Sequence, residues 1–387
     1  MRVAVLGSGG REHALRTVLG RTATVVGPDD DADLYVIGPE QPLVDGEADR
    51  LRAAGRLVFG PGADGAHLEG SKAWMKEVLD EAGVPTARYG VFTEVEPAVQ
   101  FLKSLPGLYV VKTDGLAAGK GVVVTESLDE AVDDVRAKLS GSSFGEAGRT
   151  VVIEEGLSGP ELSVLAVCDG QRAVALPPAR DFKRLLEGDE GPNTGGMGAY
   201  SPVAEAGAEV VSAVMSAAVE PTLAALRARG VDYRGVLYTG LMLTPDGPKV
   251  LEYNVRFGDP EAQVVLPRFA GDLAGFLAEA AAGRLRTEPS FVDDACVAVV
   301  LAAAGYPLSP RAGDVVTGIQ EAEEEDGVLV FRAGVRTDDD GRTVTAGGRV
   351  LNVCALAPTV DDARRRAYAA VERISFEGMQ YRKDIAA

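Results

Sequence analysis

Cysteine is scarce in this sequence, and the few cysteines are widely separated. Cys168, Cys296 and Cys354 each lie in an apolar run, and none of them belongs to a C-x-x-C pair. This spacing offers no disulfide framework. We therefore expect buried, reduced thiols and a cytoplasmic protein, because the cytosol keeps thiols reduced.

Positive charge is also scarce. The chain has 39 Lys and Arg residues against 58 Asp and Glu residues, which gives a formal net charge of −19 at pH 7. A nucleic-acid binder needs a basic face toward the phosphate backbone, so this balance excludes that class of partner. It does not exclude a small phosphorylated ligand, because one basic pocket within an acidic surface is enough to bind it.

Long apolar runs are absent as well. No uninterrupted run reaches the ~18 residues that span a bilayer, so we expect no membrane association. The opening MRVAVLG begins a strand at once and does not resemble a signal peptide. The 387 residues are 46% hydrophobic and 25% charged, which is typical of a globular protein. We expect about two to four domains and a monomer or a weak dimer.

The sequence does have a glycine-rich stretch between two β-branched runs, at Val110 to Thr125. The flanking patterns predict a β-hairpin. The glycines at its tip let the backbone approach an anion closely, and Lys120 adds a positive charge. The stretch is not a Walker A loop, because the glycine spacing differs and a strand follows it. We interpret it as a flap over phosphates; an ordinary hairpin with solvated lysines is the alternative.

Two strand ends near the amino terminus are candidates for one ligand crevice. The strand Arg2 to Leu6 runs into Gly7–Gly10 and a helix, and such a turn can present N–H groups to a phosphate. A second strand ends in the run GPEQPLV, at Gly38 to Val44. Ligands gather at the carboxyl ends of parallel strands, so we predict a small α/β domain with its crevice there.

Lys72 lies in the first turn of a predicted helix that Ser71 caps. A cation opposes the helix dipole at this position, which indicates that it faces an anion. A solvated surface lysine is the alternative.

Further along, a strand ends in Glu154-Glu155-Gly156-Leu157, and Glu161 follows. This pattern is typical of a hinge against a purine, in which the backbone contacts the base and a carboxylate contacts the ribose. These acids could equally be solvated strand-end charges.

The segment Arg180 to Tyr200 has almost no hydrophobic periodicity, so we predict a long loop. Loops of this length within a domain are usually functional. Asp181, Lys183 and Arg184, together with the glycines at 195–198, provide charge and exposed backbone.

Strand alternation places Glu252, Asn254 and Arg256 on one face of a predicted strand. A carboxylate and an amide suit Mg²⁺ bound to phosphates, and the arginine suits a transferring phosphoryl group. Asp259 and Glu261 follow closely. A solvated strand face is the alternative.

Taken together, these motifs are highly specific, and the chain resembles the glycinamide ribonucleotide synthetase (phosphoribosylamine–glycine ligase) family of ATP-grasp enzymes over nearly its whole length. The matching runs are GSGGREHAL, GPEQPLV, LEGSKAWMK, VVKTDGLAAGKGVVV, VVIEEGLSGPELS, GPNTGGMGAYSP, VLEYNVRFGDPEAQ, GGRVLNV and RKDI.

The resemblance implies an ATP-grasp fold of mixed α/β and α+β class. It implies a shortened parallel-sheet domain at 1–68, an ATP-grasp domain at 69–294 with a mobile lid at about 88–157, and a small α+β domain at 295–387.

The resemblance also implies a reaction. ATP phosphorylates the carboxylate of glycine, and the amine of 5-phosphoribosylamine attacks the acyl phosphate, giving an amide, ADP and phosphate. The implied cofactors are ATP and Mg²⁺ (or Mn²⁺).

By the same resemblance, Glu252 and Asn254 bind the metal. The implied catalytic residues are Lys120, Asp181, Lys183 and Arg256. The implied ATP contacts are Lys72, Lys112, Gly115, Gly119, Lys120, Gly121, Glu154, Glu155, Leu157 and Glu161. The implied contacts to glycine and the amine are Gly9, Gly10, Arg11, Glu40, Pro42, Asn193, Thr194, Gly195, Gly196 and Asp259.

Three departures from the family pattern lie on the acceptor and amino-acid side. Between Val26 and Leu34 a βα unit of roughly two dozen residues is absent. The usual QDHKR is RDFKR here, and the usual GNGG is GSGG. One alternative is therefore an ATP-grasp paralogue that joins a different carboxylate and amine. Another is a non-catalytic nucleotide-binding protein, against which the intact lysine and Glu-x-Asn-x-Arg positions speak.

Overall fold

The amino-terminal residues form the parallel sheet that the sequence predicts. In this computed structural model, which describes residues 1–116, 121–141 and 149–387, four parallel strands have the order β2-β1-β3-β4. Val3, Val5 and Val36 are fully buried, since α1 covers the sheet. The elements are β1 (Arg2–Leu6), α1 (Gly10–Leu19), β2 (Thr24–Val26), β3 (Leu34–Ile37), α2 (Glu40–Val44), α3 (Glu47–Ala53), β4 (Val58–Phe59) and α4 (Ala63–Gly70).

The connection between β2 and β3 is unusually short. Both strands run parallel to β1 on its two sides, yet only residues 27–33 join them. Parallel strands normally need a crossover of about a dozen residues or more, usually with a helix. Here Arg2 holds the connection, because its N–H donates to Asp33 Oδ2 at 2.7 Å and its Nε donates to Asp31 O at 2.9 Å. The short connection therefore leaves no room for a crossover helix between β2 and β3.

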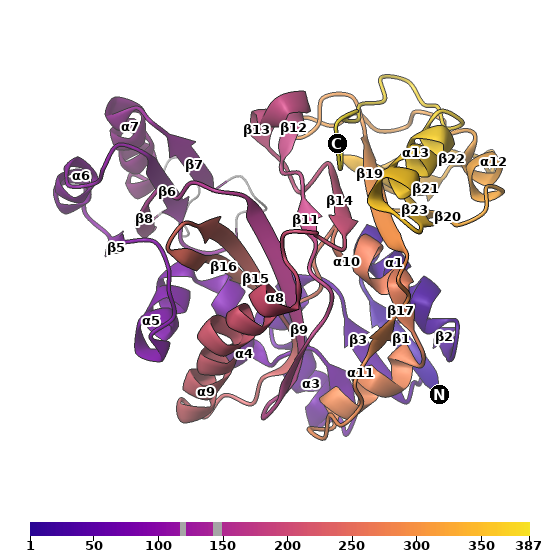
Figure 1. The fold of residues 1–387 in the computed structure, drawn as a ribbon, viewed down its shortest axis with the longest axis horizontal. Coiled ribbons are helices and arrows are strands. Elements are labelled where there is room, and N and C mark those ends of the chain that lie inside the picture. The colour runs from indigo at the N-terminus through magenta and orange to yellow at the C-terminus, as the bar shows by residue number, and fades with distance from the viewer. Residues whose placement is uncertain (117–120, 142–148) are drawn as a thin grey trace.

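A second body carries the glycine-rich hairpin and lies at the upper left of Figure 1. Its antiparallel sheet has the order β5-β8-β6-β7, and α6 and α7 pack on it. The predicted hairpin is confirmed, with Val110 opposite Val124; of its tip, Gly119 and Lys120 lie outside the described residues. The elements are α5 (Lys72–Ala82), which leads in, then β5 (Tyr89–Phe92), α6 (Val95–Lys103), β6 (Tyr109–Thr113), β7 (Val122–Thr125), α7 (Leu128–Leu139) and β8 (Val151–Glu155).

The central antiparallel sheet has the order β10-β9-β15-β16. Its long strands are almost continuously apolar because both faces are buried, with Val164 and Leu165 each at 0% exposure. Glu161 begins β9, and Glu252 and Asn254 end β16, so the sheet delivers both groups to one region. The elements are β9 (Glu161–Asp169), β10 (Ala173–Ala175), β15 (Arg234–Thr244), β16 (Gly247–Asn254), α10 (Ala262–Val265), η4 (Leu266–Arg268), β17 (Phe269–Ala270), α11 (Leu273–Ala281) and β18 (Ser290–Phe291).

The carboxyl-terminal sheet includes a segment that we predicted to be a loop. The interval 180–200 contains short strands, and two of these, β11 and β14, join the order β11-β14-β19-β23-β20. Strands of two to four residues are too short to show a period in the sequence. The elements are β11 (Arg180–Asp181), β12 (Arg184–Leu186), η2 (Glu187–Asp189), β13 (Glu190–Asn193), β14 (Gly198–Ser201), β19 (Ala295–Ala302), α12 (Ile319–Glu323), β20 (Val328–Arg332), β21 (Val335–Thr337), β22 (Thr343–Thr345), β23 (Arg349–Ala357) and α13 (Val360–Val371).

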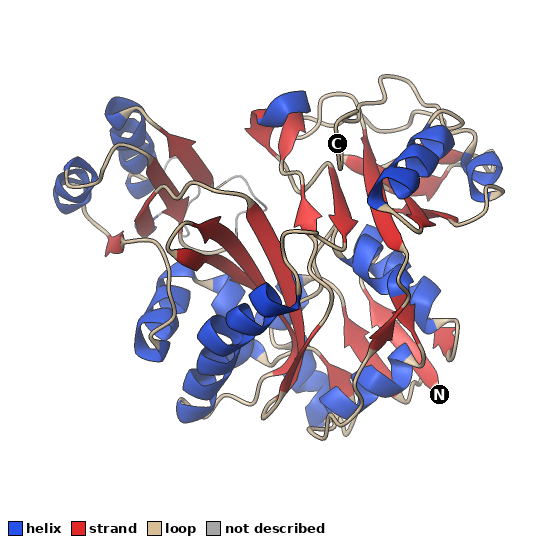
Figure 2. Ribbon diagram, in the orientation of Figure 1, coloured by secondary structure: helices blue, strands red, loops and turns tan. Residues whose placement is uncertain are grey.

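One helical region, Ala208–Ala228, is long and apolar enough to cross a membrane by length and composition alone, with a mean hydropathy of 1.4. Glu209, Glu220 and Arg227 interrupt its apolar residues. It consists of α8 (Ala208–Val214), a π-turn at Met215–Val219 and α9 (Glu220–Ala228), as Figure 2 shows in blue. Pro221 lacks an N–H, which accounts for the irregular turn before it. Val219 and Leu226 of this region pack into the protein core.

The thiol prediction is confirmed. Cys168, Cys296 and Cys354 are buried and free, and burial raises the pKa of Cys168 and Cys296 to about 12.

Candidate active site

Two cavities lie side by side between the lid sheet, the central sheet and the 180–196 segment. The larger has a volume of about 870 Å³ and the smaller about 460 Å³. Both are lined by Asp181, Lys183 and Glu252, so they meet at these three charged side chains. The arrangement gives one ligand a large slot, a second ligand a smaller one, and a shared wall where groups from both can react.

The larger cavity begins as an apolar slot. Val110 and Val124 of the lid hairpin face Leu157 of the hinge and Met242 of the central sheet. Glu155 sits at the hinge, but its carboxylate accepts the Arg88 N–H at 3.0 Å. The slot therefore offers apolar walls and hinge backbone, which is the arrangement predicted for a purine.

Deeper in the cavity, Glu154 holds two lysines. Its Oε1 lies 2.7 Å from Lys112 Nζ, and its Oε2 lies 3.0 Å from Lys76 Nζ. Lys76 is fully buried and also donates to Thr86 Oγ1 at 2.7 Å. Burial lowers the pKa of Lys76 to about 8, although Glu154 opposes the shift. The carboxylate of Glu154 therefore has lysine partners of its own, so any contact with a purine would come from its backbone.

Lys76 was missed by the sequence analysis, although a signal was present. It lies four residues after Lys72 on the same helix, so both lysines are on one helix face. Two like charges at this spacing destabilise a helix unless an anion lies between them, and here Glu154 is an anion bonded to Lys76.

Lys72 links α5 to the lid hairpin. Its Nζ donates to Gly115 O at 2.8 Å. Next to it, the Asp114 carboxylate accepts the Ala73 N–H at 3.1 Å and the Ser71 hydroxyl at 3.2 Å, so the lid supplies the anion that the helix N-terminus favours. Burial lowers the pKa of Lys72, and Glu252 opposes this shift. The predicted cap is confirmed, since Ser71 Oγ accepts the Trp74 N–H.

Glu252 and Asn254 lie side by side on β16 and line the smaller cavity, as alternation predicts. Burial favours the neutral form of Glu252, but Lys183, Lys112 and Lys72 together lower its pKa, so it stays ionised. Within residues 1–116, 121–141 and 149–387, no cluster of three His, Cys, Asp or Glu side chains could hold a metal alone. One carboxylate with one amide oxygen nevertheless fits Mg²⁺, which takes its other ligands from phosphates and water.

Arg256 is clamped between two carboxylates from distant parts of the chain. Its Nη2 lies 2.9 Å from Glu69 Oε1, and its Nε lies 3.3 Å from Glu40 Oε2. Glu69 also accepts the Val255 N–H at 2.8 Å, which fixes the end of β16. Burial raises the pKa of Glu69, whereas Arg256 and Arg11 outweigh burial and lower that of Glu40. Glu69 was not predicted from the sequence.

The glycine turn before α1 already holds an anion. The Gly9 N–H donates to Glu12 Oε2 at 2.6 Å, and Arg11 Nε lies 2.7 Å from Glu12 Oε1. The chain's own carboxylate therefore occupies the position that the sequence analysis assigned to a phosphate. Arg11 still lines the smaller cavity, but Gly9 and Gly10 are not among its lining residues. A Cβ on Gly10 would lie 2.6 Å from Asn352 Nδ2, so Gly10 permits close packing instead.

At the shared wall, Lys183 Nζ lies 2.6 Å from Glu161 Oε2 and 3.8 Å from Glu252 Oε1. The pKa of Lys183 is raised despite burial, because Asp181, Glu161 and Glu252 surround it. Burial raises the pKa of Asp181, and the nearby carboxylates of Glu261, Glu161 and Glu252 raise it further, although the charge of Lys183 opposes the shift. Asp181, whose pKa is raised, and Glu252, which stays ionised, therefore lie close together.

The carboxyl-terminal domain reaches into the smaller cavity through two side chains that the sequence analysis did not assign. Tyr306 OH accepts the Gly195 N–H at 2.9 Å. Arg349 Nη1 donates to Gly195 O and, at 2.8 Å, to Asp259 O, while its Nη2 lies 3.3 Å from Asp259 Oδ2. The run GGRVLNV was the available signal for Arg349.

Of the contacts predicted for glycine and the amine, Asn193 and Thr194 line both cavities, whereas Pro42 and Gly196 line neither.

Comparison with protein families gives matches along most of the chain. Residues 28–69 match the N domain of phosphoribosylglycinamide synthetase, residues 70–262 its ATP-grasp (A) domain, and residues 296–387 its C domain. The domain boundaries predicted from the sequence, near residues 68 and 294, stay predictions.

Individual relatives agree with these matches. The chain is 46% identical to the phosphoribosylamine–glycine ligase of Streptomyces coelicolor, with 100% of this chain and 99% of the relative covered. It is 44% identical to that of Caulobacter vibrioides, with 100% and 97% covered. The first alignment runs over 422 positions, more than the 387 residues of this chain, so it opens gaps here.

Solved structures show the same relationship. The phosphoribosylamine–glycine ligase of Thermotoga maritima superposes with a TM-score of 0.85 at 36% identity, covering 100% of both chains. The biotin carboxylase of Campylobacter jejuni, solved as a β,γ-ATP complex, reaches a TM-score of 0.73 at 14% identity, covering 100% of this chain and 94% of that one. This second likeness shows the ATP-grasp fold alone. The chain belongs to the phosphoribosylglycinamide synthetase (phosphoribosylamine–glycine ligase) family.

Proposed function

We propose that the protein joins glycine to 5-phosphoribosylamine at the expense of ATP, by way of glycyl phosphate, and releases glycinamide ribonucleotide, ADP and phosphate. The observation that carries the proposal is the meeting of two cavities at Asp181, Lys183 and Glu252. A phosphate donor in one cavity and an acceptor in the other would place their reacting ends at this shared wall.

The larger cavity suits ATP. The apolar slot would take the adenine, Glu161 lies where ribose hydroxyls would bind, and Lys112 lines the same cavity. Lys72 lines the smaller cavity, where it would meet the phosphates that reach the shared wall. Gly115 and Gly121 would approach the nucleotide, and the assignment of Gly119 and Lys120, which lie outside the described residues, stays a prediction. Lys183 is paired with Glu161, so nucleotide binding would compete with that ion pair.

Glu252 and Asn254 would hold Mg²⁺ (or Mn²⁺), which neutralises phosphate charge and polarises the transferring group when bound. Arg256 lines the same cavity, and its guanidinium would stabilise the charge on the phosphoryl group. Because Glu40 and Glu69 hold Arg256 rigidly, little reorganisation is needed during transfer.

The smaller cavity suits the second step. Arg11, Glu40 and Asp259 line it, and Asn193 to Gly195 border the wall shared with the nucleotide. Lys183 would hold the glycine carboxylate in line with the phosphoryl group, and Asp181 would accept the proton that the attacking amine loses. These roles consist of positioning and electrostatics, without a covalent enzyme intermediate.

The alternative, a paralogue that uses a different amine, has no support from the full-length relatives, which are named phosphoribosylamine–glycine ligase. The deciding experiment measures ADP and phosphate release with ATP, Mg²⁺, glycine and 5-phosphoribosylamine. Turnover that requires both glycine and 5-phosphoribosylamine supports the proposal. If these two substrates give no turnover but another amine does, the paralogue function replaces it.

We also infer a cytoplasmic enzyme that works as a monomer or weak dimer on small-molecule substrates, without nucleic acid or membrane. The buried free thiols and the net charge of −19 support this setting. Sedimentation at several protein concentrations tests the assembly state.

A further inference from the structure

Arg382, in the RKDI run near the carboxyl terminus, is a buried arginine outside both cavities. It is 1% exposed. Its Nε and Nη2 donate to Asp384 at 2.7 and 2.6 Å, and its Nη1 donates to Asp189 Oδ1 at 2.8 Å and Arg184 O at 3.1 Å. A buried guanidinium with this many directed bonds fixes the relative position of the segments it joins.

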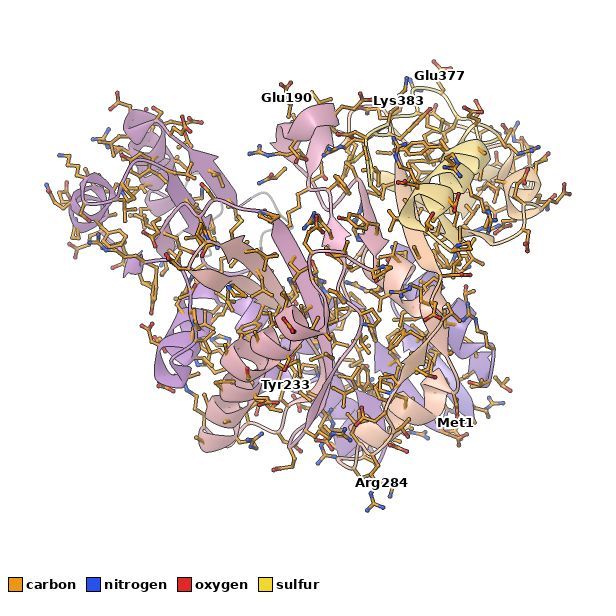
Figure 3. All side chains as sticks on the ribbon, viewed as in Figure 1. Met1, Glu190, Tyr233, Arg284, Glu377 and Lys383 are labelled. Atoms are coloured by element: carbon orange, nitrogen blue, oxygen red, sulfur yellow. The ribbon has the colours of Figure 1, made fainter. Side chains whose placement is uncertain are left out.

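The segments joined are the chain end and the hairpin β12–η2–β13, which we call the acceptor hairpin (184–193). Figure 3 labels Glu190 on this hairpin and Lys383 on the neighbouring segment. Two further bonds connect them, from Gly188 N to Asp384 Oδ2 at 2.9 Å and from Lys383 N to Glu187 Oε1 at 3.3 Å. Within the part of the chain that the structure describes, residues 184–192 have no other hydrogen bond or ion pair outside the hairpin.

The base of the acceptor hairpin is the shared wall of the two cavities. Thr194 N and its hydroxyl both donate to Lys183 O at 2.8 Å, so the hairpin closes directly on Lys183. Arg382 also lies over the ring of Phe182, with its Cζ 5.0 Å from the centroid. Phe182 separates Asp181 from Lys183, and its ring packs against the carboxyl-terminal core while the two charged side chains line both cavities.

We propose that Arg382 is a positioning residue for the ligation reaction, which orients Asp181 and Lys183 by bracing the acceptor hairpin and stacking on Phe182. The proposal rests on the proposed function for its kinetic test. Without the guanidinium, the carboxylates of Asp189 and Asp384 would face each other uncompensated and push the hairpin away from the chain end.

The kinetic test compares the parent enzyme with Arg382→Ala. Because misplacement of about 1 Å can cost about 100-fold in rate, we expect kcat to fall by about 10- to 100-fold. The dissociation constant of MgADP should stay within about twofold, since Val110, Val124, Leu157 and Met242 form the apolar slot and Arg382 itself lines neither cavity. Millimolar guanidinium should restore part of the lost kcat, which a general folding defect would not allow.

A second arm does not depend on the reaction. Trypsin cleavage after Lys183 or Arg184, followed by mass spectrometry, measures how firmly the hairpin is held, and Arg382→Ala should be cleaved several-fold faster than the parent. Phe182→Leu, which keeps an apolar side chain, should lower kcat less and leave the cleavage rate nearly unchanged. Arg373→Ala, which removes an exposed pair with Glu325 in the same domain, is the matched control and should resemble the parent.

The proposal is overturned if Arg382→Ala keeps kcat within twofold of the parent, or if its hairpin is cleaved at the parent rate. It is equally overturned if nucleotide affinity falls in proportion to kcat, because the defect is then global. A parent that does not turn over glycine with 5-phosphoribosylamine refutes the proposed function instead, and leaves the cleavage arm to decide on the brace.

Discussion

At the scale of single residues, charge in this protein is organised as opposed groups around the site. Lysines and arginines there are held by carboxylates from other segments, as Glu154 holds Lys76 and Lys112 and as Glu69 holds Arg256. Breaking such a buried set leaves a charge without its partner, which costs far more than the loss of a surface pair.

Glu252→Ala tests the metal site. The variant removes the only carboxylate of the Glu252–Asn254 pair, so loss of a bound metal worth several kcal/mol should lower turnover by roughly 100-fold or more. The measurement is the dependence of kcat on Mg²⁺ concentration. Near-normal turnover at saturating Mg²⁺ would refute the assignment. The control is Glu288→Ala, which removes an exposed ion pair with Arg172 and should keep the turnover of the parent.

Lys76→Met tests the buried lysine. Removing one partner of a buried ion pair typically costs about 3–5 kcal/mol of unfolding free energy, and the remaining Lys112 should keep the loss near the lower end. The pKa of Lys76 falls from 10.5 to about 8, so between these values the unfolded chain binds more protons than the folded one. The stability of the parent should therefore rise relative to Lys76→Met as the pH increases from about 8 toward 10.5. Denaturant midpoints of both proteins at pH 7.5 and 9.5 measure this difference in stability. A difference that shrinks as the pH rises contradicts the prediction.

At the scale of elements, the lid and α5 are joined by one carboxylate. Asp114, at the end of β6, serves the amino terminus of α5, where Lys72 reaches back to Gly115. Lys72, which we propose contacts ATP, and the β6–β7 hairpin are thus linked at one point, so a change in either should affect the other.

Asp114→Ala should lower the unfolding free energy by about 1 kcal/mol, as loss of a helix cap does, and should also raise the KM for ATP. Ser127→Ala is the matched control, because Ser127 caps α7 through the Glu130 N–H at a distance from the cavities. It should lose comparable stability and keep the parent KM. Equal KM values for the two variants would show that the contact of Asp114 with α5 does not affect ATP binding.

Elements with a clear period or turn were predictable from sequence, and this covered the parallel sheet, the β6–β7 hairpin and the face of β16 that carries Glu252 and Asn254. The strands within 180–200 were not, because each is too short to repeat a pattern. Lys76, Glu69, Tyr306 and Arg349 were missed because their partners lie far away in the chain. The Gly9 N–H donates to Glu12 of the same motif, a contact that the sequence pattern did not reveal, and the assignment of this turn to the substrate stays a prediction.

At the scale of the whole molecule, the site segment and the carboxyl-terminal domain share one sheet. β14 pairs with β19 from Gly198 opposite Val299 to Ser201 opposite Cys296. Asp181 and Lys183 are therefore held in place partly by residues beyond 294, although the predicted boundary falls there.

A chain truncated after residue 294 should fail to form the site. It would lose the partner of β14 and expose buried apolar residues around Ala199. We expect aggregation or a broadened unfolding transition, and no ATP turnover. Adding the 295–387 fragment should restore turnover if the two parts can pair, and a truncated chain that is active alone would contradict the shared sheet.

The connection at 27–33 is a place where the chain can be short without disturbing the site. The strands that deliver Arg11 and Glu40 are neighbours in the middle of the parallel sheet, and the short link passes from its edge strand around Arg2. Material removed at that point leaves the register of the inner strands unchanged. The positions of Arg11 and Glu40 therefore depend on the two inner strands, and the edge connection can change in length without moving them.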